Sequence, residues 1–138
     1  MKVLFDTNVY VSEALVGGLA EALIDASLAA RWRVFTAPYV LDELERVLRE
    51  KLNFSARVAA LARQRARRRC ELTVTPASRH TVLSDLNDSP ILRTAIGAGV
   101  DYLVTDDRHL LQMHPYEGIH ILSMRDFAEL LRAQGLLP

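Results

Sequence analysis

Short apolar runs alternate along the chain with longer stretches whose apolar residues recur at helical spacing. The short runs predict five strands, at 2–5, 33–37, 70–75, 102–105 and 119–122. The longer stretches predict helices at 19–31, 38–52, about 56–69, 89–99, and from 124 to about 135. Strands that alternate with helices are typical of a parallel sheet with helices on both faces. We therefore expect an α/β fold.

Residues that favour helix ends support several of these boundaries. Pro38 suits the first position of a helix, and Gly99 suits the position just after one. Ser55 is placed to cap the helix that follows it, and Ser123 with Asp126 forms a capping-box pattern before the last helix. These residues make the helix starts better defined than the strand ends.

The composition is that of an ordinary globular domain. Half of the 138 residues are hydrophobic, a quarter are charged, and the formal net charge is zero. Any affinity for nucleic acid is therefore expected from a local patch. Cys70 is the only cysteine, which excludes an internal disulfide and a cysteine-based zinc site. With no signal-like or membrane-spanning run, we expect one cytoplasmic domain over residues 1–138 and no membrane partner.

Carboxylates gather where the predicted strands end. The first strand ends in Asp6 and the fourth is followed by Asp106 and Asp107, while Asp85 and Asp88 precede the helix at 89. In open parallel sheets, ligands bind beyond the carboxyl ends of the strands. Clustered carboxylates repel unless a cation lies between them, and Mg²⁺ and Mn²⁺ take such oxygen ligands. The pattern indicates metal-assisted hydrolysis of a phosphodiester.

Each acid alone also has an ordinary structural explanation. Asp88 before Ser89 and Pro90 is a typical N-cap, and Asp106 and Asp107 suit a turn. Asp6 is different, because it follows an apolar strand and no turn or helix is predicted to start there. The combination, rather than any single acid, favours a metal site.

Three segments resemble the PIN-domain family. They are "FDTNV", "APYVLDELERVLREKL" and "DLNDSPILRTAIGAGVDYLVTDDRHLL", and they follow in the family's order. The best resemblance is to the VapC-like ribonucleases, the toxins of prokaryotic toxin–antitoxin pairs. It implies a three-layer α/β/α domain with a mainly parallel sheet of order 3-2-1-4-5. It further implies RNA cleavage with Mg²⁺ or Mn²⁺, a homodimer, and inhibition by a cognate antitoxin protein.

The resemblance also implies the site residues. The catalytic and metal-binding acids fall on Asp6, Glu43, Asp88 and Asp107. Water activated by the metal would cut the RNA strand and leave a 5′-phosphate and a 3′-hydroxyl.

Other positions are expected to support these acids. Thr7, Asn8 and Thr105 supply hydrogen bonds, and Asp106 stands where the family usually has glycine. If that position needs a positive φ, aspartate tolerates it less well than glycine does. Whether Asp106 or Asp107 faces the metal therefore stays open.

The helix that carries Glu43 does not single it out by periodicity. At 100° per residue the apolar stripe centres near Leu44, and Asp42 points away from it. Glu43 and Glu45 fall on opposite edges of the stripe. Only the resemblance selects Glu43.

The segment 57–69 holds six arginines in thirteen residues. Such a run either contacts an RNA backbone, docks an antitoxin, or forms a solvated helix face. Three consecutive arginines spread around a helix rather than forming one stripe. The candidate RNA contacts are Arg63, Arg67, Arg68 and Arg108.

Three other functions fit parts of the pattern. A phosphoacceptor receiver domain needs a lysine after its last strand, but the chain has only Lys2 and Lys51. A haloacid-dehalogenase-type phosphatase needs a second acid where Asn8 stands. A catalytically weak PIN-like module that binds RNA or protein is the stronger alternative, because Asp106 departs from the family pattern.

Overall fold

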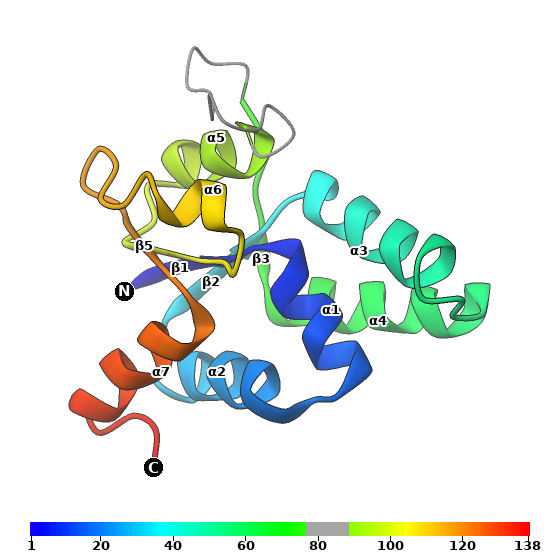
Figure 1. Ribbon diagram of the computed structural model, residues 1–138, viewed down its shortest axis with the longest axis horizontal. Helices are drawn as coiled ribbons and strands as arrows, with labels where there is room; N and C mark the ends of the chain where they lie inside the picture. Colours follow the sequence, from blue (N-terminus) through cyan, green and yellow to red (C-terminus); the bar gives the residue numbers. More distant parts are fainter. Residues whose placement is uncertain (77–88) are drawn as a thin grey trace.

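A parallel five-stranded sheet lies at the centre of the computed structural model, which describes residues 1–76 and 89–138 (Figure 1). The strands are β1 (Lys2–Phe5), β2 (Arg33–Thr36), β3 (Glu71–Leu72), β4 (Tyr102–Val104) and β5 (His120–Leu122). They are ordered β3-β2-β1-β4-β5, and every neighbouring pair is parallel. In the register, Leu4 lies between Phe35 and Leu103. The predicted strand order is confirmed.

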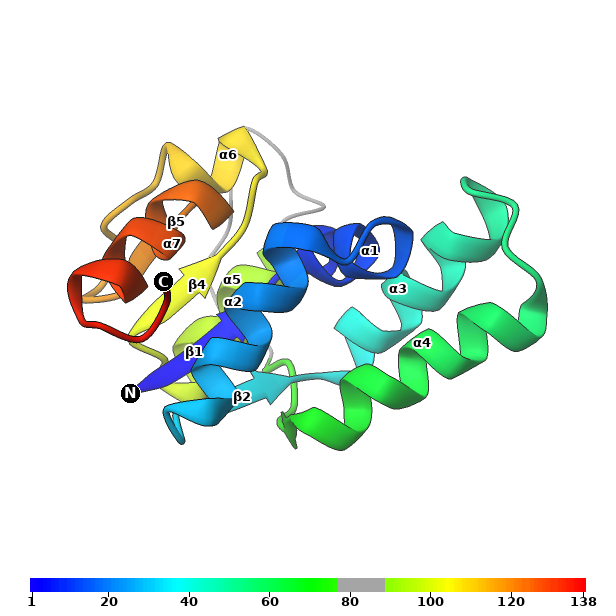
Figure 2. The same cartoon turned by 90° about the horizontal axis from the view of Figure 1, so that it is seen from below.

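Helices cover both faces of this sheet. They are α1 (Thr7–Leu15), α2 (Gly18–Ala29), α3 (Pro38–Glu50), α4 (Ala56–Arg69), α5 (Ser89–Ala98), α6 (Arg108–Leu111) and α7 (Met124–Ala133). Helices α2 and α7 lie on one face and α5 on the other, while α3 and α4 lie side by side beyond the sheet (Figures 1 and 2). Among the described helices, none combines the length and apolar content that a bilayer crossing requires. The α/β/α layering is confirmed.

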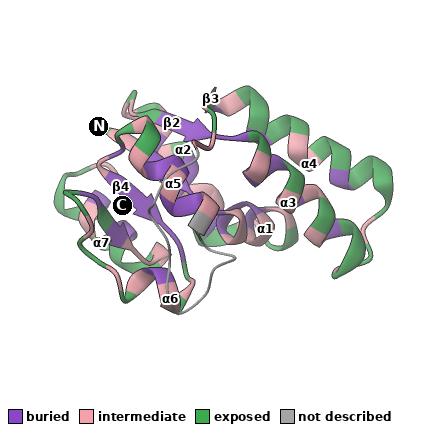
Figure 3. Cartoon of the chain, turned by 90° about the horizontal axis from the view of Figure 1, so that it is seen from above, coloured by how far each residue is buried: buried purple, intermediate pink, exposed green. Residues whose placement is uncertain are grey.

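Strands β1 and β4 lie inside the sheet and are buried. In Figure 3 the arrow of β4 has the colour of buried residues. Val3, Leu4 and Phe5 of β1 have no exposed surface, and neither do Leu103 and Val104 of β4. Strands covered on both faces read as continuous apolar runs rather than alternating ones. This is why the runs at 2–5 and 102–105 stand out in the sequence. Their carboxyl ends place Asp6 and Thr105 at one edge of the sheet.

The third strand is much shorter than the 70–75 predicted from its residue types. It pairs with β2 only over Glu71 and Leu72, followed by one bond from the Thr73 N–H to the Thr36 carbonyl. Strand β2 ends there because Pro38 starts α3. Residues with high strand propensity form a strand only where a neighbouring strand pairs with them, and β2 offers no partner to the residues after Thr73. Beyond it, Val74 is 75% exposed.

Two helices, α1 and α6, were not predicted. Helix α1 begins "TNVYV", whose residues have low helix propensity, and all of them except Asn8 favour strands. Helix α6 has only four residues. Each begins directly after an aspartate N-cap, Asp6 for α1 and Asp107 for α6. Helix α1 starts directly after Asp6, so the inference that no helix starts there is wrong. The chain turns from β1 into α1 at this residue, and the Asp6 side chain caps the new helix.

A buried ion pair fastens α1 to α4. The Glu13 carboxylate, 5% exposed, accepts hydrogen bonds from Nη1 and Nη2 of Arg69 at 2.8 and 2.6 Å. Next to it, the Tyr10 hydroxyl lies 3.2 Å from the Cys70 thiol. A buried carboxylate is tolerated when its partner is held in good geometry. One arginine of the basic run therefore stabilises the helix that starts at Asp6.

Candidate functional site

A cavity of about 330 Å³ opens at the carboxyl edge of the sheet, between α1, α3 and the turn after β4. Three of its carboxylates come from separate parts of the chain. It is lined by Asp6, Thr7, Asn8, Val11, Tyr39, Glu43, Arg46, Val47, Lys51 and Asp107. The carboxyl ends of β1 and β4 place Asp6 and Asp107 at one edge of the sheet, as expected for parallel strands, and α3 adds Glu43.

Asp6 is the most enclosed acid of this cavity, with 9% of its surface exposed. Its Oδ1 accepts a hydrogen bond of 2.7 Å from the Thr7 N–H, which caps α1. Its Oδ2 accepts from the Thr105 hydroxyl at 2.8 Å and from the Asn8 amide at 3.4 Å. Asp6 thus accepts hydrogen bonds from Thr7, Asn8 and Thr105, with Thr7 donating through its backbone N–H. They fix the carboxylate in one orientation.

The Thr105 hydroxyl connects the two strand ends. While it donates to Asp6, it accepts from the Asn8 side-chain amide at 3.3 Å and from the Asp107 N–H at 3.0 Å. Thr105 has no exposed surface. A buried hydroxyl with all its bonds satisfied holds its partners firmly. It sets the position of Asp6 relative to the turn that carries Asp107.

Burial raises the pKa of the Asp6 carboxyl from 3.8 to about 6. Loss of water contact is the main cause, and the hydrogen bonds from Thr105 and Thr7 oppose it. The negative charges of Asp107 and Glu43 raise the pKa further. Burial and the neighbouring negative charges therefore both disfavour the ionised form of Asp6.

This shift predicts a pH dependence of stability in the metal-free protein. Between pH 3.8 and about 6 the unfolded chain has lost the Asp6 proton that the folded protein keeps. The free energy of unfolding should therefore fall as pH rises through this window, by about 3 kcal/mol, and stay level above it. Urea denaturation in a chelator at several pH values measures this.

The comparison variant for this measurement is Asp6→Asn, which cannot titrate. Subtracting its unfolding free energy from that of the wild type removes the contribution of all other groups. Asp42→Asn, an exposed acid outside the cavity, should retain the wild-type profile. A difference between wild type and Asp6→Asn that is constant with pH would contradict the raised pKa.

The two acids after β4 have different surroundings. Asp107 lines the cavity, and its Oδ1 caps α6 by accepting from the N–H groups of His109 and Leu110 at 2.8 and 3.3 Å. Asp106 is exposed and turned away, with Oδ1 accepting from the Met124 N–H at the start of α7 at 3.0 Å. The structure thus places Asp107, and not Asp106, in the cavity.

The backbone at Asp106, where the PIN-domain family usually has glycine, is not strained. Within the described chain, the non-glycine residues with positive φ are Arg31, Asn53 and Glu117. Asp106 is not among them. The position needs no left-handed conformation here, so aspartate takes it without cost.

Helix α3 brings Glu43 into the cavity and directs Glu45 elsewhere. Glu45 lies 3.5 Å from Arg63 on the side of α3 that faces α4. Both oxygens of Glu43 accept hydrogen bonds from Arg46, at 2.9 Å from Nε and 3.0 Å from Nη2. This pairing, helped by the positive charge of Lys51, lowers the pKa of the Glu43 carboxyl. Of the two edges of the apolar stripe, the edge with Glu43 thus lines the cavity, and the edge with Glu45 faces Arg63 of α4.

The fourth predicted acid, Asp88, lies outside the described residues, as does Asp85. Within residues 1–76 and 89–138, no three or more His, Cys, Asp or Glu side chains are grouped closely enough to hold a metal ion as they stand. Both oxygens of Glu43 are bonded to Arg46, so a cation in the cavity would compete with the guanidinium for this carboxylate. The three carboxylates nevertheless supply the oxygen ligands that Mg²⁺ and Mn²⁺ prefer.

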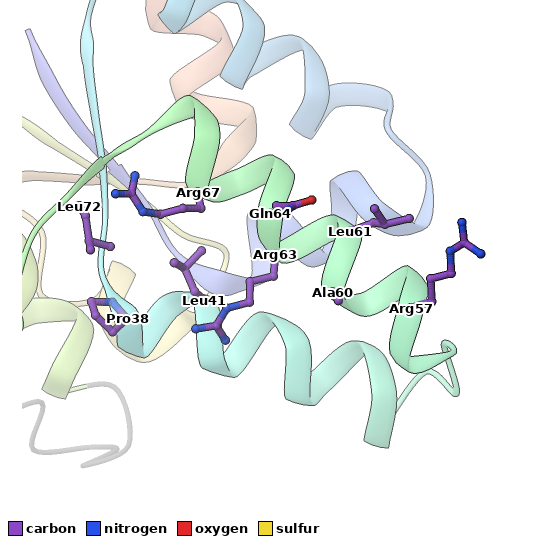
Figure 4. Close-up of a pocket in the computed structure, with 9 residues that line it drawn as sticks. All are labelled: Pro38, Leu41, Arg57, Ala60, Leu61, Arg63, Gln64, Arg67 and Leu72. Atoms are coloured by element: carbon purple, nitrogen blue, oxygen red, sulfur yellow. The ribbon is translucent and has the colours of Figure 1, made fainter.

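The predicted RNA contacts are scattered. Arg63 and Arg67 line a groove of about 600 Å³ with Leu41, Leu61 and Leu72, between α4, the start of α3 and β3 (Figure 4). At 100° per residue, this groove and the acidic cavity lie on opposite sides of α3.

The pairing of these arginines also differs. Arg63 is paired with Asp42 at 2.7 Å, and Arg67 donates to the Cys70 carbonyl. Arg68 is exposed on α4, and Arg108 is exposed beside Asp107. Of the four, only Arg108 is adjacent in sequence to a cavity residue. Their contact with RNA stays a prediction.

Sequence reasoning missed the basic side of the cavity, formed by Arg46 and Lys51. The available signal was the spacing of Glu43 and Arg46, which are three residues apart on a helix and therefore adjacent on its surface. Such pairs are common on solvated helices. The pattern alone does not show that this one lines a cavity.

Two solved structures share this fold at low sequence identity. One is a chain of the VapBC2 complex from Rickettsia felis, determined bound to a DNA fragment from its promoter. Its TM-score is 0.65 at 15% sequence identity, and the match covers 89% of the present chain and 98% of the Rickettsia felis chain. The other is PAE2754 from Pyrobaculum aerophilum, with a TM-score of 0.64 and 18% identity, over 97% of this chain and 91% of that one. A search of curated proteins finds no match.

The match to a family of sequences is more direct. Residues 2–109 match the model of a PIN domain family, and this span contains β1 to β4 and every described residue of the acidic cavity. The match covers well over half of the chain. The chain therefore belongs to the PIN domain family.

Proposed function

We propose that the protein is a metal-dependent endoribonuclease and the toxin of a toxin–antitoxin pair. The observation that carries this proposal is Asp6, a buried carboxylate at the end of β1 whose pKa rises to about 6. Burial and the nearby charges of Asp107 and Glu43 both disfavour its ionised form. A divalent cation in the cavity would remove this penalty.

The residues fit a hard cation by their chemistry. Asp6, Glu43 and Asp107 would bind Mg²⁺ or Mn²⁺, together with Asp88, which the resemblance assigns. When bound, the ion supplies Lewis acidity that lowers the pKa of water and offsets the charge growing on phosphate oxygens.

The remaining residues preorganise this site. The Thr7 N–H and the Thr105 hydroxyl fix the two oxygens of Asp6, and the first turn of α6 fixes Oδ1 of Asp107. Because these donors belong to helix starts and strand ends, Asp6 and Asp107 need little rearrangement when the substrate binds.

RNA is the proposed substrate, and a cognate antitoxin and a second copy of the chain are the proposed partners. These proposals rest on the resemblance to VapC-like toxins. They are supported by the likeness of the fold to a chain of the Rickettsia felis VapBC2 complex.

The main alternative is a PIN-like module that binds without cutting, and its sequence basis is Asp106. The side chain of Asp106 lies outside the cavity and bonds to the start of α7. The departure from glycine therefore leaves the acidic lining unchanged, which favours the enzyme.

Cleavage of a mixed-sequence single-stranded RNA by the purified protein tests the proposal. We expect cutting in Mg²⁺ or Mn²⁺ and none in EDTA. A non-catalytic binding module would retain RNA in EDTA and leave it intact in every buffer. Cutting that continues in EDTA would contradict the role of the metal.

A further inference from the structure

The acidic cavity also holds two cationic side chains, and none of the roles above explains them. Arg46 and Lys51 line it together with Asp6, Glu43 and Asp107. Arg46 is on α3 one turn after Glu43, and Lys51 is the C-cap of the same helix. A cavity that only bound a cation would be weakened by two positive charges on its wall. Their presence suggests a second, anionic ligand.

Arg46 is held between two acids on α3. It forms a two-pronged pair with Glu43, at 2.9 and 3.0 Å, and a single contact of 3.3 Å with Glu50. The side chains of Arg46 and Glu50 are 42% and 65% exposed. The contact with Glu50 is thus well solvated and weak, whereas the bidentate pair with Glu43 fixes the guanidinium.

The Arg46 guanidinium and a divalent cation would compete for Glu43. The guanidinium bonds to both carboxylate oxygens, and its positive charge repels a divalent ion placed beside the same carboxylate. If Glu43 turned toward a bound cation, Arg46 would lose its main partner while remaining on the wall of the same cavity. The Arg46 guanidinium would then be free to make a two-pronged contact with another oxyanion.

We propose that Arg46 and Lys51 form a phosphate-binding subsite for the RNA strand, available once Glu43 exchanges Arg46 for the cation. This inference rests on the proposed function. A guanidinium matches two phosphate oxygens in a fork, and the Lys51 ammonium adds a flexible point charge beside it. Metal binding and RNA binding are thereby linked, because the first releases the residue that the second uses.

The linkage gives opposite effects when Arg46 is removed. In Arg46→Gln, Glu43 is no longer paired with a guanidinium, so no positive side chain competes with Mn²⁺ for it. Mn²⁺ should therefore bind about threefold to tenfold more tightly in the absence of RNA. The same variant loses a phosphate contact, so it should bind single-stranded RNA about tenfold more weakly. The slope of log binding constant against log salt should become shallower by about 0.7. A residue that merely supports Glu43 would not produce opposite signs.

The experiment measures both affinities on the full chain. Mn²⁺ binding is followed by the electron paramagnetic resonance signal of the free ion. RNA binding is followed by fluorescence anisotropy in Ca²⁺, and a denaturing gel confirms that the RNA stays intact. Lys51→Gln is the second variant, and it should weaken RNA binding while leaving Mn²⁺ affinity nearer to wild type.

Arg49→Gln is the matched control. It removes the same charge from the same helix, at an exposed position that does not line the acidic cavity. Both affinities should stay within twofold of wild type, and circular dichroism should show that all variants are folded.

Two results would overturn the subsite. If Arg46→Gln changes neither affinity, or changes both in the same direction, Arg46 is a support for Glu43 and binds no phosphate. These outcomes leave the proposed function intact, provided that the wild type binds Mn²⁺ and RNA. A wild type that binds neither would overturn the proposed function and the subsite together.

Discussion

Asp6→Asn should lower metal-dependent RNA cleavage by about a thousandfold or more. The substitution keeps the shape of the side chain and one oxygen to cap α1, but it removes the charge that anchors a cation at the end of β1. Metal-ion catalysis supplies several kcal/mol of charge stabilisation, and each 1.36 kcal/mol is worth about tenfold in rate. The initial rate of cutting of a labelled single-stranded RNA in Mn²⁺ measures the effect.

The matched control is Asp42→Asn, which makes the same chemical change on helix α3. Asp42 is 68% exposed, pairs with Arg63 and lies outside the acidic cavity. Its cleavage rate should stay within about twofold of wild type. If Asp6→Asn cut RNA within tenfold of wild type, the site would be assigned to the wrong edge of the molecule or the activity to a contaminant.

The second large effect is expected for Thr105→Val, which replaces a buried hydroxyl by a methyl group of similar size. Asp6 loses its shortest side-chain donor, and the Asn8 amide and the Asp107 N–H lose an acceptor. Each buried polar group left without a partner costs about 1–3 kcal/mol. We expect the free energy of unfolding to fall by about 3 kcal/mol and cleavage to fall about 10- to 100-fold.

Urea denaturation and the same cleavage assay measure the two effects of Thr105→Val. Thr105→Ser is the control, because it keeps the hydroxyl and loses only a methyl group. It should recover most of the cleavage rate while remaining somewhat less stable than the wild type. Equal activity of the Val and Ser variants would show that the hydroxyl does not position the acids.

The sheet was predictable from sequence because its central strands are buried on both faces. Val3 to Phe5 and Leu103 to Val104 are continuous apolar runs, and the alternation with helices gives the parallel arrangement. The edge strand β3 was overestimated, since residue types do not show where the partner strand ends. Helix α1 was missed because Asn8, Val9 and Val11 favour other structures when judged alone.

The site was predictable where it depends on strand ends and unpredictable where it depends on packing. Asp6 and the pair Asp106 and Asp107 follow from the rule that parallel strands present their carboxyl ends at one edge. The rule does not say which of the pair lines the cavity, and the structure shows that Asp107 does. The choice of Glu43 over Glu45 depends on which side of α3 faces α1, and periodicity does not contain that information. The pairing of Glu13 with Arg69 joins positions 56 residues apart, so no local pattern signals it.

The most direct test of the central claim is a titration of Mn²⁺ into the metal-free protein. We expect saturable binding to the wild type and to Asp42→Asn, weaker binding to Asp107→Asn and none to Asp6→Asn. The affinity of the wild type should increase as pH rises through about 6, because Asp6 must lose its proton to bind the ion. Equal Mn²⁺ affinity in wild type and Asp6→Asn, or no binding to either, would contradict a cation site at the carboxyl edge of the sheet.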